Sequence, residues 1–181
     1  KTFHPTAWMQ MGYEIIYLWM ARMILFSGYL LNDIPFKQVY IHGILRDKDG
    51  KKFSKSTKNG IDPLEVIAEY GTDALRLSVI KGIAPGADAR FFYDKIKDSR
   101  NFINKLWNVS RYILSMEDGQ ESAIQQSFAD QWILSRLQRV NRNVTEYLEK
   151  DQFSRVAEEL YDFVWHELAD WYLEAAKVSL N

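Results

Sequence analysis

The chain has 181 residues, of which 47% are hydrophobic, 14% aromatic and 26% charged. With nine Gly, four Pro and no Cys, this composition excludes collagen-like chains, disordered chains, disulfide scaffolds and thiolate zinc sites. The formal net charge is -1, so no overall positive field marks the chain as a nucleic-acid binder. Any nucleic-acid-binding surface therefore has to be local.

The first part of the chain has the pattern of mixed α and β structure. An extended segment is expected at residues 3–11, a helix at residues 14–31 and a strand at residues 37–42. The apolar stretch 15–31 is interrupted by Arg22 and falls short of the ~20 apolar residues that a membrane span needs. We therefore predict a buried helix there rather than a membrane span.

The chain begins with Lys1, and no secretory signal pattern follows it. We expect a segment of a longer protein. The absence of Cys is compatible with a reducing compartment, and the expected location is the cytoplasm.

Positive charge is concentrated between residues 46 and 58, which hold six basic side chains against two acidic ones. Within this region, residues 50–60 read Gly-Lys-Lys-Phe-Ser-Lys-Ser-Thr-Lys-Asn-Gly. Lysine ammonium groups separated by small hydroxyl residues can close on phosphate oxygens and stabilise the charge of a reacting triphosphate. By charge alone, a solvated surface loop is an equally valid interpretation.

Helix signals follow this lysine-rich loop. Asp62 predicts a helix start, because Pro63 follows it and Glu65 occupies the third helical position. A second helix is expected at residues 72–81, capped by its first residue, a threonine. The Gly and Pro residues between 82 and 86 mark a linker.

Three segments after residue 90 carry apolar residues at spacings of three and four, which predicts amphipathic helices. Their apolar stripes are Ile96, Ile103, Leu106, Ile113 and Leu114; Ile133, Leu137, Val140, Val144 and Leu148; and Val156, Leu160, Phe163, Val164, Leu168, Trp171 and Tyr172. Such a series predicts an all-α bundle.

The second of these segments also carries a polar row. Arg136, Arg139 and Asn143 lie three and four apart, on the face predicted to be opposite the apolar stripe. Such a row could contact RNA phosphates or unstacked bases, although a solvated polar face is the default interpretation. The three His residues are scattered and there is no Cys, so no metal site is predicted.

The pentapeptide Lys52-Phe53-Ser54-Lys55-Ser56 resembles the KMSKS signature of class I aminoacyl-tRNA synthetases, with Phe53 in place of Met. A hydrophobic side chain at that position is expected to pack inward. The flanking segments 42–47, 59–63 and 70–76 are similar to those around this loop in the subgroup for branched aliphatic amino acids. Within that subgroup, residues 12–23, 100–108 and 165–174 look most like the valyl enzymes.

This resemblance implies a fold and a division of the chain. Residues 1–90 are expected to be the C-terminal part of the catalytic nucleotide-binding domain, an α/β remnant. Residues 91–181 are expected to be part of an anticodon-binding helical bundle, so the chain is mostly helical. The HIGH signature of the class is absent from these residues, and we expect the chain alone to be inactive.

The resemblance also implies roles for individual residues. Lys52 and Lys55 would bind the ATP triphosphate and stabilise the transition state of amino-acid activation. The residues implied in ATP binding are Gly12, Glu14, His42, Gly43, Lys52, Ser54, Lys55 and Ser56. Trp19 matches an aromatic wall of the amino-acid pocket, and the family role adds interest to Arg136, Arg139 and Asn143 as tRNA contacts.

The ligands implied are ATP with Mg²⁺, L-valine and valine tRNA, and the implied partner is the rest of a synthetase chain. A protein-bound metal and a membrane are not predicted. Two alternatives remain, namely a non-catalytic synthetase-like module that binds RNA or a protein partner, and isoleucyl or leucyl instead of valyl specificity. A truncated sheet would expose apolar surface around residues 8–23, which predicts self-association.

Overall fold

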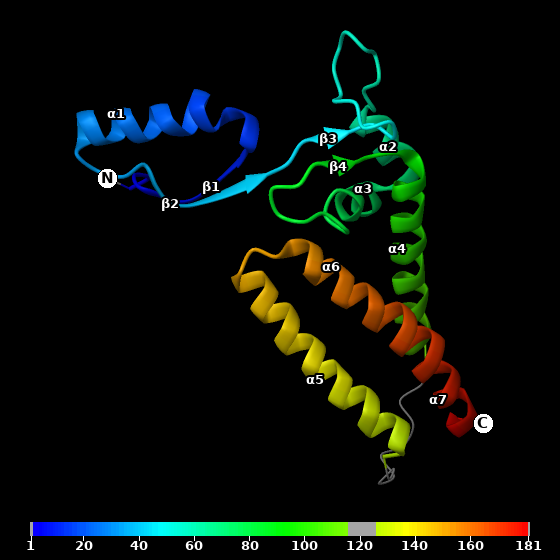
Figure 1. Ribbon diagram of the computed structural model, residues 1–181. Helices are drawn as coiled ribbons and strands as arrows, with labels where there is room; N and C mark the ends of the chain where they lie inside the picture. The colour runs from blue at the N-terminus through cyan, green and yellow to red at the C-terminus, as the bar shows by residue number, and fades with distance from the viewer. Residues whose placement is uncertain (1, 116–125, 181) are drawn as a thin grey trace. The chain divides into compact units, whose positions relative to one another are not determined.

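The computed structural model describes residues 2–115 and 126–180. The chain forms two compact units, Lys1–Gly60 with Ile83–Phe91 and Ile61–Gly82 with Phe92–Asn181, whose elements are labelled in Figure 1. All strands of the described residues lie in the first unit, whereas the second is helical. The division of the chain at residue 90 remains a prediction.

The first unit is built on a β-α-β crossover. Strand β1 (Thr6–Gly12) pairs in parallel with β2 (Phe36–His42), and Gly12 lies opposite His42. The connection is helical throughout, with a 3₁₀ turn η1 (Tyr13–Ile15), a π-helix η2 (Ile16–Met20) and α1 (Ala21–Leu31). Parallel strands require such a crossover. The predicted order of strand, helix and strand is confirmed.

A second, shorter pair of strands belongs to the same unit. Strand β3 (Leu45–Arg46) pairs in parallel with β4 (Ala89–Arg90). The lysine-rich loop leaves β3 directly, and an antiparallel bridge joins Arg46 to Lys52. The beginning of the loop is therefore attached to a strand.

The prediction of a buried helix at residues 15–31 is wrong, because Ser27 is the one buried residue of α1. Leu25 is 70% exposed and Leu30 is 68% exposed. The stretch Tyr13–Leu31 has a mean hydropathy of 1.4 and is long and apolar enough to cross a membrane, a test that core helices of soluble proteins also pass. The predicted exposure of apolar surface near residues 8–23 is confirmed, with Tyr17 85% exposed.

We expect this exposed apolar surface to make the chain self-associate. The mean mass in sedimentation equilibrium should rise with protein concentration, because large exposed apolar patches favour association. Replacing Leu25 and Leu30 together with Lys should reduce that rise without unfolding the chain, since both side chains are exposed. A monomer at every concentration would contradict the prediction.

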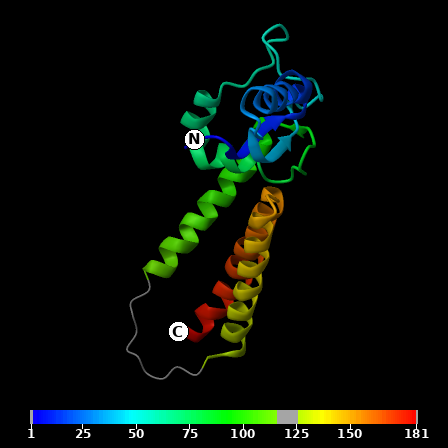
Figure 2. The same ribbon diagram turned by 90° about the vertical axis from the view of Figure 1, so that its left-hand side faces the viewer.

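The second unit is a set of helices. They are α2 (Pro63–Tyr70), α3 (Thr72–Ser78), α4 (Tyr93–Leu114), α5 (Phe128–Glu149) and a continuous helical run of α6 (Phe153–Asp162), the π-helical η3 (Phe163–Tyr172) and α7 (Leu173–Leu180). Figure 2 shows α5 beside the run from α6 to α7. The predicted fold class, an α/β part and a helical bundle, is confirmed.

Helix starts in this unit follow local chemistry. The Asp62 side chain accepts the backbone N–H of Leu64 at 2.8 Å, and Pro63 is the first helical residue, as predicted. The predicted Thr72 cap is wrong, because Gly71 occupies the cap position with φ of 90° and no side chain caps α3. Helix α5 begins with a reciprocal capping box between Ser127 and Asp130 that the sequence analysis missed.

Two small apolar clusters hold the helices together. Val109 of α4 packs with Ala169 and Leu173, and Ile133 and Val140 of α5 pack with Phe163. A polar contact accompanies the second cluster, because Arg136 binds Glu167 of η3 through two hydrogen bonds, Nε to Oε2 at 2.7 Å and Nη2 to Oε1 at 2.6 Å.

Replacing Arg136 with Ala is expected to lower the free energy of unfolding by about 1–3 kcal/mol, because it leaves the Glu167 carboxylate half-buried without its bidentate partner. Urea unfolding followed by circular dichroism measures this change. Arg139→Ala is the matched control, since Arg139 is an exposed arginine of the same helix and its removal should cost less than about 0.5 kcal/mol. Equal losses in the two variants would contradict the prediction.

Tyr172 is expected to make stability fall at alkaline pH. Its hydroxyl donates to Asp130 Oδ1 at 2.7 Å, and burial together with this bond raises the pKa of Tyr172 to about 12. Because the phenol ionises near pH ~10 in the unfolded chain, its contribution is complete below that pH and is lost as pH rises through about 12. Tyr172→Phe should flatten the free energy of unfolding between pH 9 and 12, and Tyr112→Phe should not.

Candidate functional site

The carboxyl ends of β1 and β2 gather four of the predicted site residues. Gly12 lies opposite His42, and a Cβ atom added to Gly12 would lie 3.5 Å from His42 Cε1, so the imidazole ring covers the glycine. His42 Nδ1 lies 2.7 Å from the Gly43 carbonyl oxygen. Glu14 follows in the first turn after β1. Open parallel sheets bind ligands at this edge.

The lysine-rich loop reaches the same edge through one ion pair. Lys52 Nζ donates to both carboxylate oxygens of Glu14, at 2.6 and 2.9 Å. Both side chains are about half exposed, and exposed pairs of this kind contribute only about 0–1 kcal/mol. The ammonium group can therefore exchange Glu14 for another anion, such as a phosphate, at little cost.

Asp88 fixes the backbone from which the loop departs. Its carboxylate accepts the Ile44 N–H at 2.8 Å, the Arg46 guanidinium and, at 3.3 Å, the Tyr13 hydroxyl. The Ile44 N–H is the main reason that the pKa of Asp88 is lowered, and Arg46 adds to it. This approach requires a glycine at position 43, because a Cβ atom there would lie 1.9 Å from the backbone carbonyl oxygen that precedes Asp88.

The loop itself presents its second predicted lysine to solvent. Lys55 is exposed, and the hydroxyl of Ser54 lies 2.8 Å from that of Ser56 and 2.9 Å from that of Thr57. The Phe53 ring meets Phe91 edge-on at a centroid distance of 6.5 Å, so the aromatic residue in place of Met packs against the strand region as expected. The hydroxyl groups shape the turn that carries Lys55.

Trp19 lies in a separate, mainly apolar groove of about 670 Å³ along α1. The groove is lined by His4, Leu18, Trp19, Arg22, Met23, Phe26, Ser27, Leu30, Leu31 and Pro35. The Trp19 ring is 61% exposed and can serve as a wall for apolar groups. The described contacts do not join Trp19 to the Glu14–Lys52 pair.

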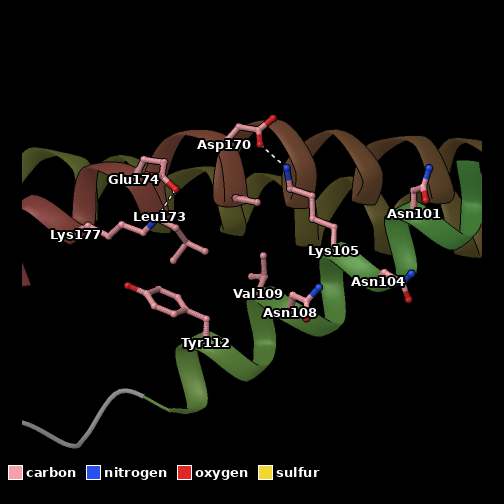
Figure 3. Close-up of a pocket in the computed structure, with 11 residues that line it drawn as sticks. Asn101, Asn104, Lys105, Asn108, Val109, Tyr112, Asp170, Leu173, Glu174 and Lys177 are labelled. Carbon is pink, nitrogen blue, oxygen red and sulfur yellow. Dashed lines mark hydrogen bonds and ion pairs between the residues drawn. The ribbon is translucent and has the colours of Figure 1, made fainter.

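The helical unit contains a polar groove of about 730 Å³ between α4 and the run from η3 to α7 (Figure 3). Three amides from one face of α4 lie along it, those of Asn101, Asn104 and Asn108. Ion pairs of Lys105 with Asp170 and of Lys177 with Glu174 form the other parts of the wall, together with the ring of Tyr112. Amides, ammonium groups and an aromatic ring are the groups that recognise unstacked RNA bases.

The predicted row on α5 differs from its expected arrangement. Arg136 is bound to Glu167, and Asn143 Nδ2 donates to Glu159 Oε1 at 3.0 Å, so both face the neighbouring helical run. Arg139 alone of the three is exposed. The apolar stripe is wide enough that these two side chains flank it instead of opposing it.

The sequence matches the family model of class I tRNA synthetases (I, L, M and V) over residues 1–91. Residues 130–181 match the anticodon-binding domain of tRNA ligases. The chain therefore belongs to the class I tRNA synthetase family, as its KMSKS-like loop predicted.

The relatives narrow this class. The chain is 47% identical to the valine–tRNA ligase of Clostridium tetani, covering 98% of this chain and 21% of that one. It is 42% identical to the valine–tRNA ligase of Bacillus subtilis, covering 99% of this chain and 21% of that one. The chain thus spans about a fifth of the length of these curated relatives, and the predicted resemblance to the valyl enzymes is confirmed.

A solved structure supports the fold. The crystal structure of the Agrobacterium radiobacter K84 LeuRS–tRNA–LeuAMS ternary complex matches with a TM-score of 0.73 and 22% identity, over 88% of this chain and 22% of that one. Within residues 2–115 and 126–180, no group of three His, Asp or Glu side chains is placed to hold a metal ion.

Proposed function

We propose that this chain supplies the ATP-phosphate-binding loop and the tRNA-binding helices of a valine–tRNA ligase, which activates L-valine with ATP and transfers it to its tRNA. The observation that carries the proposal is the contact of Lys52 with Glu14 at the carboxyl edge of the parallel strands. It joins the lysine-rich loop to residues that match the nucleotide-binding positions of the family. The names of the relatives support valine over isoleucine or leucine.

Activation forms a bond between the valine carboxylate and the α-phosphorus of ATP and releases pyrophosphate. On ATP binding, Lys52 exchanges the Glu14 carboxylate for phosphate oxygens, and Lys55 closes from solvent onto the same triphosphate. The two ammonium groups then stabilise the negative charge that develops on the departing pyrophosphate. Glu14, released from Lys52, accepts hydrogen bonds from the ribose hydroxyls. Mg²⁺ arrives with the ATP phosphates.

The other predicted site residues have supporting parts in this reaction. Gly12 and Gly43 leave room for adenosine beside His42, and the hydroxyls of Ser54 and Ser56 shape the loop. Trp19 contacts the valine methyl groups. An apolar wall discriminates against one methylene by only about 1–3 kcal/mol.

The polar groove of the helical unit is the surface that we assign to tRNA. Its amides can pair with base edges, the Tyr112 ring can stack on a base, and Lys105 and Lys177 can exchange their carboxylate partners for phosphates. Arg139 adds an exposed charge on α5. Recognition here has to rest on shape, because residues 100–181 contain nine basic and thirteen acidic side chains.

Valine-dependent exchange of pyrophosphate into ATP tests the proposed function. The full-length protein should catalyse exchange with valine and much less with isoleucine or leucine, and the 181-residue chain alone should be inactive. Exchange driven best by another amino acid would overturn the assignment to valine. A full-length protein that binds tRNA without any exchange would instead be a non-catalytic RNA-binding module.

A further inference from the structure

An amide and a carboxylate close the base of the lysine-rich loop. Asn59 Nδ2 donates to Asp47 Oδ2 at 2.8 Å and to the Lys52 carbonyl oxygen at 3.3 Å. Asn59 Oδ1 accepts the Ser54 N–H at 3.0 Å and the Thr57 hydroxyl at 2.6 Å. Every hydrogen-bonding position of this side-chain amide is therefore occupied.

Asp47 completes the arrangement from the other end of the loop. Its Oδ1 accepts the N–H groups of Asp49 at 3.0 Å and Lys51 at 2.8 Å, and its backbone N–H donates to the Lys51 carbonyl at 2.8 Å. Asn59 is the main reason that the pKa of Asp47 is lowered. The Asp47–Asn59 bond thus ties the chain that leaves β3 to the chain that follows the last lysine.

The charge of the two groups matters for this contact. An amide at position 59 offers both donors and acceptors, whereas a carboxylate there would face the Asp47 carboxylate as a like charge and could not donate to it. The arrangement can also be inverted. With Asn at 47 and Asp at 59, the amide would donate from the opposite side, and the acceptors for the backbone N–H groups of Asp49, Lys51 and Ser54 would remain.

We propose that Asn59, held by Asp47, is a positioning residue that fixes the base of the loop and thereby directs the ammonium groups of Lys52 and Lys55 toward the triphosphate. This inference rests on the proposed function, because it assigns the orientation of the same two lysines. Asn59 touches the loop backbone at Lys52 and Ser54, on both sides of Phe53, so its loss frees the backbone at the first lysine of the motif.

The test compares Asn59→Asp, Asp47→Asn and the double variant that exchanges the two side chains. Trypsin cleavage after the loop lysines of the 181-residue chain reports the order of the loop without any activity. Each single variant should be cleaved about tenfold faster than the original chain, and the exchanged pair should return to within about twofold of it. Asp49→Asn is the matched control, because it removes the same charge from an exposed neighbour in the same turn and should leave the cleavage rate unchanged.

The same variants in the full-length protein report the role of the clamp in activation. Each single variant should lower the kcat of valine-dependent pyrophosphate exchange by about 10- to 100-fold, with the KM for valine unchanged and recovery in the exchanged pair. Cleavage and kcat that stay at the original values in both single variants, or an exchanged pair as defective as they are, would overturn the proposal. Exchange absent from the original full-length protein, with the cleavage pattern as expected, would overturn the proposed function and leave the loop clamp standing.

Discussion

Replacing Lys55 with Ala in the full-length protein is expected to slow valyl-adenylate formation by about 100- to 1000-fold, the usual cost of removing one group that stabilises transition-state charge. Lys52→Ala should have a similar effect on the same step. Both ammonium groups are available to an incoming triphosphate, because Lys55 is exposed and Lys52 is held only by the exposed Glu14 pair. Rapid-quench measurement of adenylate formed in a single turnover isolates the chemical step.

The control for these variants is Lys58→Ala, which removes an exposed lysine of the same loop outside the matched motif. It should leave the single-turnover rate within about threefold of the original value, because a distant exposed charge contributes little through water. A loss in Lys58→Ala as large as in Lys55→Ala would mean that the loop acts only through its total charge. An unchanged rate in Lys55→Ala would restore the interpretation of a solvated surface loop.

Replacing Tyr112 with Ala is expected to weaken binding of valine tRNA by about 10- to 100-fold, in the range measured for losing one aromatic stacking partner of a base. The ring lines the polar groove beside Lys177, whose Nζ lies 5.9 Å from the ring centroid. Lys105→Ala should weaken binding by a similar factor and reduce the salt dependence. Filter binding at several salt concentrations measures both effects.

Two matched variants separate recognition in the groove from general charge. Tyr112→Phe keeps the ring and should keep the affinity, while Arg111→Ala removes an exposed charge of the same helix end and should act weakly. Full affinity in Tyr112→Ala and Lys105→Ala together would move the tRNA surface away from this groove.

The elements of this chain could be predicted where the signal is local. The strand at residues 37–42 and the helix beginning after Asp62 follow from alternation and capping chemistry within a few residues. The capping box of Ser127 and Asp130 was also visible in the sequence, but it precedes its apolar stripe by a full turn and was missed. Thr72 failed as a cap because the glycine before it breaks the chain more strongly.

Burial and partners could not be predicted in the same way. The apolar pattern of α1 indicates a face that can be covered, but not whether these 181 residues cover it, and in this structure Leu25 remains exposed. Arg136 and Asn143 were placed by helical geometry alone, whereas their orientation depends on the Glu residues of the neighbouring helical run.

The candidate site shows the same division. The identities of Gly12, Glu14, His42 and Lys52 were available from the resemblance, but the contact of Lys52 with Glu14 joins residues 38 positions apart and requires the fold. The sequence analysis did not select Asn59, because an Asn before a Gly is an ordinary turn signal. Its partner Asp47 lies on the other side of the loop, and only the structure places the two side chains in contact.

Binding of this chain to valine tRNA, and to the same tRNA with a changed anticodon, across a series of salt concentrations, tests most directly whether it is a tRNA-recognising part of a synthetase. We expect tighter binding to the native anticodon at every salt concentration, because base contacts carry specificity while phosphate contacts carry the salt dependence. Equal and steeply salt-dependent binding to both tRNAs would contradict this expectation, and would reduce the contact to the positive charge of the lysine-rich loop.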